Sequence, residues 1–143
     1  KPKNGTKQIL FIGSKLSEVN IISEDYYLKM IKKISNFYRN QEIVYVAHRA
    51  ESINKINLIR TIENITVRYI NLPLELWSVK NNFYPQKIVS FYSTSLITLS
   101  KILDVESIGI KFSIKDSSIE NIVNQVFEFY KDYITILNED NFK

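Results

Sequence analysis

Short apolar runs alternate with segments of helical periodicity along most of this chain, and this alternation constrains the fold more than any other feature. Five runs have the apolar character of buried strands: Gln8–Ile12, Glu42–Ala47, Thr66–Ile70, the segment with Ile88, Val89 and Phe91, and Ser107–Phe112. Strands that alternate with amphipathic helices are typical of a parallel sheet covered on both faces. The sequence therefore predicts a three-layer α/β fold with a sheet of five or six strands.

The helical segments between these runs have recognisable starts. Ser23 is placed to cap the first helix, Pro73 suits the first turn of a short helix through Trp77, and Ser117 with Glu120 has the form of a capping box. Apolar spacing predicts three inner faces: Tyr27, Met30, Ile31, Ile34, Phe37 and Tyr38; Leu96, Leu99, Ile102 and Leu103; and Ile119, Ile122, Val123, Val126, Phe129 and Tyr130. Ile53, Ile56, Ile59 and Ile62 also recur at helical spacing. The polar tail after Leu137 is expected to fray.

Composition bounds the class of protein. At 143 residues, with 45% hydrophobic and 24% charged residues, the chain suits one globular domain with its own core. It has no cysteine, which excludes disulfides and thiolate metal sites and fits a reducing compartment. With a single histidine, a structural zinc site is not expected either. The net charge of +4 is spread along the chain, so no dedicated nucleic-acid surface is predicted.

The stretch Lys87–Ile102 combines a buried strand, three consecutive hydroxyl residues (Ser93, Thr94 and Ser95) and the start of a helix. Free backbone N–H groups in a first helical turn attract anions, and hydroxyl side chains can donate to a phosphate. The structural alternative is that Ser93 or Thr94 simply caps the helix. The stretch therefore predicts either a helix cap or a phosphate site.

Three loops are expected to meet at one edge of the sheet. In a parallel sheet with strand order 3-2-1-4-5, the loops after Ile12, Ala47 and Tyr92 open on the same side, where ligands of such sheets bind. These loops carry Gly13-Ser14, His48-Arg49-x-Glu51 and the three hydroxyl residues. The residues capable of chemistry therefore converge on one rim.

Each charged candidate has two interpretations. His48, as an imidazolium, can stabilise a leaving phosphate, or it can be merely packed or exposed. Arg49 can contact phosphate or form a salt bridge with Glu51, and Glu51 can orient His48 or lie nearby by chance. Glu75 can accept hydrogen bonds from ribose hydroxyls or can simply suit a helix start. Gly13-Ser14 lacks the full G-x-G-x-x-G pattern, so a dinucleotide cofactor is not expected.

The order of His48-Arg49-x-Glu51, Leu72–Glu75 and Phe91–Leu96 resembles the nucleotide-binding half of bacterial sialyltransferases. Between Gln8 and Phe112 the chain is similar to glycosyltransferase family 52 and to the related bacterial polysialyltransferases. The resemblance implies a Rossmann-like domain, the C-terminal half of a GT-B glycosyltransferase. It also implies inverting transfer from CMP-sialic acid to a bacterial surface glycan, either capsule or lipooligosaccharide, without a metal or another cofactor.

The family signature is a His-Pro dipeptide and a Ser-Ser/Thr motif, both directed at the CMP phosphate. By resemblance, His48 takes the first role, and Ser93, Thr94 and Ser95 take the second. Glu75 would lie near the ribose. Gly13-Ser14 and Arg49 are candidate nucleotide and phosphate contacts from their place on the rim, not from the resemblance. Arg49 stands where many members have proline, so the loop is less rigid than the family pattern implies.

The resemblance also sets the expected domain organisation. Residues 1–143 would form a single donor-binding domain in which 1–7 is a linker remnant, and the N-terminal acceptor domain with the general base would lie outside the chain. This piece alone would bind nucleotide weakly and catalyse little. Expected partners are a nucleotide sugar and, through the other domain, an acceptor glycan, but not nucleic acid. A cytoplasmic location is expected, extending to peripheral association of the full-length protein with the inner face of the membrane, and oligomer formation stays open.

Two alternatives stay open. The chain can be the donor domain of a GT-B enzyme that uses another nucleotide sugar, such as a UDP- or GDP-sugar. It can also be a non-enzymatic α/β interaction module whose rim residues only cap helices and contact solvent.

Overall fold

The computed structural model describes residues 7–91 and 95–143, and within them six parallel strands form one sheet in the order β3-β2-β1-β4-β5-β6. The strands are β1 (Ile9–Ile12), β2 (Ile43–Val46), β3 (Ile65–Arg68), β4 (Lys87–Ser90), β5 (Glu106–Lys111) and β6 (Thr135–Asn138). The predicted parallel α/β fold and the order of its first five strands are confirmed. The sixth strand lies at the edge of the sheet beside β5.

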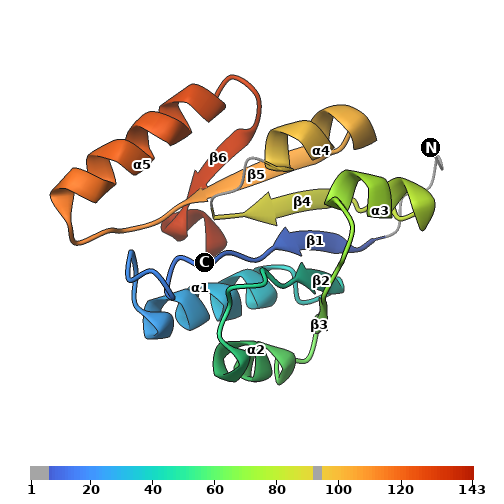
Figure 1. Cartoon of the computed structure of the whole chain (residues 1–143), viewed down its shortest axis with the longest axis horizontal. Coiled ribbons are helices and arrows are strands. Elements are labelled where there is room, and N and C mark those ends of the chain that lie inside the picture. Colours follow the sequence, from blue (N-terminus) through green and yellow to red (C-terminus); the bar gives the residue numbers. More distant parts are fainter. Residues whose placement is uncertain (1–6, 92–94) are drawn as a thin grey trace.

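Helices cover both faces of this sheet. They are α1 (Glu24–Phe37), α2 (Ile53–Arg60), α3 (Leu74–Lys80), α4 (Ser95–Leu103), α5 (Ser117–Tyr130) and the 3-10 turn η1 (Glu139–Phe142). Figure 1 shows α1 and α2 on one side of the sheet and α3, α4 and α5 on the other. The fold is therefore Rossmann-like, with three layers. Within the described part of the chain, no helix has the length and apolar character needed to span a membrane.

The central strands are apolar without interruption because both of their faces are covered. In β1, Ile9 and Phe11 belong to the core cluster around α1 and α2, whereas Leu10 and Ile12 belong to the cluster that contains α4. Successive side chains of a strand point to opposite faces, so a strand between two helical layers needs apolar residues at every position. The continuous apolar run at Gln8–Ile12 has this physical cause.

The N-cap of α1 is the residue predicted from the sequence, whereas the N-cap of α5 is a different residue from the predicted one. Ser23 caps α1 as predicted, because its side chain accepts the N–H of Tyr26 at 3.0 Å. The capping box predicted from Ser117 and Glu120 does not form. Instead Asp116 is the N-cap of α5, and its Oδ1 accepts the N–H groups of Ser118 at 3.0 Å and Ile119 at 3.4 Å. An aspartate one residue upstream competes for the same N–H groups, and here it takes them.

Several predicted inner-face residues are exposed. Ile102 on α4 and both Ile122 and Phe129 on α5 are more than half exposed, and Phe37 at the end of α1 is 47% exposed. In α5, Val123 and Tyr130 are buried as predicted, and Phe127 is buried although it was not predicted to be. Only about a 100° sector of a helix faces the sheet, so adjacent apolar residues cannot all be buried.

The C-terminal tail is ordered and packed, which corrects the expectation that it frays. Asn138 caps η1, and Phe142 is buried with its ring 5.2 Å from the ring of Phe37. Phe142 also lies 6.4 Å from the ring of Tyr38. The buried ring of Phe142, together with the contacts of Glu139 with Tyr26 and Lys33, docks a segment that is otherwise polar.

Candidate functional site

The order of strands reverses between β1 and β4. Strand β1 pairs with β2 on one side and with β4 on the other, in the register Ile12 to Val46 and Ile12 to Ser90. At such a switch point the loops after neighbouring strands run to opposite faces of the sheet and leave a crevice outside the carboxyl ends. Gly13-Ser14 follows β1 directly, and His48 follows β2 by two residues. The carboxyl edge beside β1 is therefore the candidate site.

Gly13 lies so close to its neighbours that a side chain would not fit. A β carbon on Gly13 would come within 2.8 Å of two ring carbons of Tyr45 and closer still to Oε1 of Glu51. The N–H of Gly13 donates to the carbonyl of Val46 at 2.8 Å. A glycine is required here by close approach, which brings the loop after β1 against Glu51.

Glu51 is a buried carboxylate with a full set of partners. Its Oε1 accepts the backbone N–H of His48 at 2.8 Å. Its Oε2 accepts the hydroxyl of Tyr45 at 2.6 Å and lies 3.0 Å from the ammonium of Lys55. Burial raises the pKa of Glu51, and the hydrogen bonds of Tyr45 and His48 and the charge of Lys55 oppose that rise. Glu51 thus holds the backbone of the His48 turn rather than the imidazole.

Lys55 is the buried cation of the site, and its side chain has no exposed surface. Besides Glu51, its Nζ contacts Oε1 of Glu18 at 3.0 Å, the carbonyl of Ser14 at 3.2 Å and Oγ of Ser17 at 3.2 Å. The ammonium also lies 3.8 Å from the centre of the Tyr27 ring. The cation is therefore surrounded by oxygens and one aromatic face, as a buried charge requires.

Glu18 joins the loop after β1 to the start of α2. Its Oε2 accepts the N–H of Ser52 at 2.8 Å, while Oε1 pairs with Lys55. Ser52 is the N-cap of α2, so the carboxylate lies at the positive end of that helix. Partial burial alone would raise the pKa of Glu18, but the hydrogen bonds from Ser52 and Lys55 outweigh it and lower the pKa.

Two tyrosines complete a chain of hydrogen bonds from the first loop to Glu51. The N–H of Ser14 donates to the Tyr27 hydroxyl at 3.1 Å, and the hydroxyls of Tyr27 and Tyr45 lie 2.6 Å apart. Because Tyr45 gives its single proton to Glu51, Tyr27 is the donor to Tyr45. Burial raises the pKa of both hydroxyls, so the chain stays protonated at neutral pH.

His48 lies at the surface of this cluster with a defined ring orientation. The N–H of Ala50 donates to its Nδ1 at 3.0 Å, which requires that Nδ1 carries no proton. The neutral ring therefore has its proton on Nε2. Because the side chain is exposed, Nε2 is available to donate to a ligand.

The structure brings some of the predicted residues together and not others. Gly13, Ser14 and His48 are joined through the cluster of Glu51, Lys55 and the two tyrosines. The predicted salt bridge between Arg49 and Glu51 is wrong, because Lys55 occupies that carboxylate and Arg49 is exposed. Glu75 lies half-buried in the first turn of α3, and no hydrogen bond or ion pair among residues 7–91 and 95–143 links it to the cluster.

The predicted hydroxyl motif lies mostly outside the described residues. Ser93 and Thr94 are not among them, and Ser95 is described only as the first residue of α4. The role of all three in phosphate binding stays a prediction.

Sequence spacing did not identify Lys55, Glu18, Tyr27 and Tyr45 as residues of the site. One signal was present, because Glu51 and Lys55 stand four residues apart, the spacing at which an acid and a base pair on a helix. The tyrosines and Glu18 had no such signal, since they come from distant segments.

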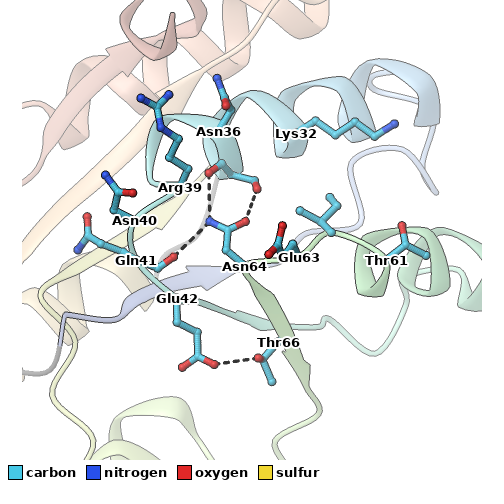
Figure 2. Close-up of a pocket in the computed structure, with 12 residues that line it drawn as sticks. Lys32, Asn36, Arg39, Asn40, Gln41, Glu42, Thr61, Glu63, Asn64 and Thr66 are labelled. Atoms are coloured by element: carbon cyan, nitrogen blue, oxygen red, sulfur yellow. Dashed lines mark hydrogen bonds between the residues drawn. The ribbon is translucent and has the colours of Figure 1, made fainter.

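A pocket of about 800 Å³ lies at the opposite, amino edge of the sheet. Figure 2 shows Asn64 at its centre, where the side-chain amide donates to the carbonyls of Ser35 at 3.1 Å and Gln41 at 3.2 Å. The same amide donates to Tyr38 at 3.2 Å. Asn64 thus binds backbone carbonyls at and just after the C-terminal end of α1. The pocket lies away from the edge at which sheets of this kind bind ligands.

A second pocket, of about 520 Å³, opens on the carboxyl edge between the loop after β1 and the loop after β5. Its apolar wall includes Ile21, Ile22 and Ile114. Tyr26 also lines it, and its hydroxyl accepts the N–H of Ser113 at 3.1 Å and donates to Glu139 at 2.8 Å. Within the described chain, this pocket has none of the predicted site residues in its wall.

Fold and edge together define a Rossmann-like domain whose candidate site lies at the carboxyl ends of the central strands. The family model for alpha-2,8-polysialyltransferase (POLYST) matches residues 3–110. The chain therefore belongs to the alpha-2,8-polysialyltransferase family, which confirms the predicted relation to bacterial sialyltransferases; membership of family 52 and the C-terminal position stay predictions.

No curated protein matches the chain significantly. Among solved structures, the E. coli heptosyltransferase WaaC with ADP is similar, with 16% sequence identity and a TM-score of 0.48. That match covers 91% of this chain and 46% of the heptosyltransferase chain, so the present chain spans less than half of that protein.

Proposed function

We propose that this chain binds CMP-sialic acid, the donor of a sialyltransferase, at the carboxyl edge around β1. Membership of the polysialyltransferase family supports a sialyl donor. The proposed position of the donor is supported by the buried hydrogen-bond network that joins the Gly13-Ser14 loop to the His48 turn at the switch point. Nε2 of His48, the hydroxyls of Ser93–Ser95 and the first turn of α4 are the proposed donors to the phosphate, with Arg49 as an additional cation.

The proposed reaction needs phosphate stabilisation from this domain more than it needs a nucleophile. An acceptor hydroxyl attacks the anomeric carbon of sialic acid from the face opposite CMP, and the bond from that carbon to the phosphate oxygen breaks, so that the configuration inverts. The proton of the acceptor goes to a general base, which we place in another part of the whole protein. Hydrogen-bond donors at the departing phosphate stabilise the charge that develops there, and no metal is required for this step.

The nucleoside has two candidate places, and a pair of variants distinguishes them. The pocket between the loops after β1 and β5 has apolar walls and a volume of about 520 Å³, and it lies on the same edge as His48. Glu75 is the alternative, as an acceptor for ribose hydroxyls. Ile114→Asp should weaken CMP binding more than phosphate binding if the pocket takes the base, whereas Glu75→Gln should do so if Glu75 holds the ribose.

The test is a titration of the chain with CMP, followed by amide resonances. We expect saturable shifts at His48 and at Ser93–Leu96 in the millimolar range, and weaker binding by the double variant His48→Ala, Ser93→Ala. Lys32→Ala at the amino edge is the control and should bind CMP as the wild type does. Unchanged spectra at millimolar CMP would contradict the proposal. Tighter binding of UMP or GDP than of CMP would instead indicate that the donor is a UDP- or GDP-sugar.

A further inference from the structure

Lys55 places a charge on the core-facing side of α2, where apolar residues are the rule. It lies on the inner side of α2 next to Ile56 and Ile59, and its side chain has no exposed surface. Removing an ammonium from water costs free energy that even a well-formed ion pair often fails to recover, and replacing a whole buried pair by well-packed apolar residues is often neutral or stabilising. The buried charge therefore calls for an explanation other than packing.

The partners of Lys55 come from two loops that have no strand pairing of their own. Ser14, Ser17 and Glu18 belong to the loop after β1, and Glu51 belongs to the turn after β2. The last backbone link between these strands is the bond from Gly13 N–H to the Val46 carbonyl. Beyond that point, the cluster around Lys55 is what joins the two loops.

Lys55 is connected to His48 through Glu51. The carboxylate that pairs with Lys55 also accepts the backbone N–H of His48, at 2.8 Å. The turn that follows directs the N–H of Ala50 to Nδ1 of the imidazole, which fixes the ring and leaves Nε2 as the outward donor. Lys55 itself does not reach the surface, so its effect on a ligand is indirect.

We propose that Lys55 is a positioning residue of the donor edge: it holds the loop after β1 and the His48 turn in fixed relation, so that the edge is arranged for an anion before one binds. The proposal rests on the proposed function for the identity of the anion, but the arrangement of His48 can be tested without a ligand. Preorganised donors bind without the entropic cost of ordering them, so loss of Lys55 should weaken binding.

The test compares Lys55→Met with Asn64→Ala, a control that removes the hydrogen bonds of the Asn64 side chain at the amino edge. Because His48 is the only histidine, its ring nitrogen resonances are unambiguous. In the wild type and in Asn64→Ala we expect the tautomer with the proton on Nε2; in Lys55→Met we expect a mixture of tautomers and a shifted Ala50 amide. We also expect CMP affinity to fall about tenfold or more in Lys55→Met alone, a change of about 1.4 kcal/mol.

Glu18→Ala is a second variant that tests the same proposal if Lys55→Met does not fold. Glu18 is only partly buried, and its loss removes the links to Lys55 and Ser52 while the pair of Lys55 and Glu51 remains. It should weaken CMP binding several-fold. A wild-type His48 spectrum and wild-type affinity in the folded variants would overturn the proposal. If the wild type binds no CMP but the His48 tautomer still depends on Lys55, the positioning role stands and the proposed donor is wrong.

Discussion

Gly13 lies directly against the carboxylate of Glu51, and a methyl group on its α carbon would overlap Oε1 of that side chain. The carboxylate cannot simply move away, because Tyr45, His48 and Lys55 all hold it. Two loops at the carboxyl edge thus meet at a point where no side chain fits.

Gly13→Ala should therefore destabilise the domain by about 1–3 kcal/mol, the usual cost of overpacking a buried site. Urea unfolding measures the loss. Gly109→Ala is the matched control: its methyl group would meet the mobile ends of Ile134 and Ile136 at 3.0 and 3.3 Å, and we expect its stability to stay within about 1 kcal/mol of the wild type. Equal losses in the two variants would contradict the close approach at Gly13.

The cap of α5 can be tested by two adjacent substitutions. Asp116→Ala should lower the urea midpoint, because it removes the acceptor for the N–H groups of Ser118 and Ile119, whereas Ser117→Ala should leave the midpoint nearly unchanged. The hydroxyl of Ser118 is the main cause of the lowered pKa of Asp116, followed by these N–H groups. Since the folded pKa lies below the unfolded one, the cap stabilises above about pH 4 and its contribution is lost as the pH falls. A larger drop in the urea midpoint for Ser117→Ala than for Asp116→Ala would instead support the capping box predicted from Ser117 and Glu120.

Phe142 should carry much of the stability of the C-terminal segment. Phe142→Ala removes a buried ring and should cost about 3–5 kcal/mol, and it should expose the amides of β6 to faster hydrogen exchange. Phe129→Ala deletes the same group at a position that is 62% exposed, and should cost less than about 1 kcal/mol. Rapid exchange of the β6 amides already in the wild type would mean that the tail is frayed after all.

Alkaline pH should destabilise the fold through its buried tyrosines. Burial is the main cause of the raised pKa of both Tyr27 and Tyr45, and for Tyr27 the negative charge of Glu51 comes next. Above about pH 10 the unfolded chain loses these phenolic protons while the folded chain keeps them, so stability falls by up to about 1.4 kcal/mol per pH unit for each group. Urea midpoints from about pH 9 to about pH 11 measure the slope. Tyr27→Phe should flatten it more than Tyr69→Phe, which alters an exposed side chain; equal slopes would refute the assignment.

The fold could be predicted because its signals are local. Each central strand has apolar residues on both faces, and Ser23 stands at the start of α1, so short windows of sequence contain the decisive information. The orientation of individual helix positions could not be predicted as well. Ile122 and Phe129 are as apolar as Val123 and Phe127, and only the packing of α5 on the sheet decides which pair is buried.

Hydrophobic periodicity and chain order are sufficient to specify the parallel α/β sheet, the strand order around β1 and the edge on which Gly13, Ser14 and His48 lie. The ion-pair partner of Glu51, by contrast, depends on the packing of distant segments in the folded chain. Lys55 and Arg49 are both cations near it in sequence, but the turn into α2 directs Lys55 inward to Glu18 and the loop after β1, while Arg49 faces water. A buried charge selects its partner by geometry in three dimensions, and neither composition nor spacing records that geometry.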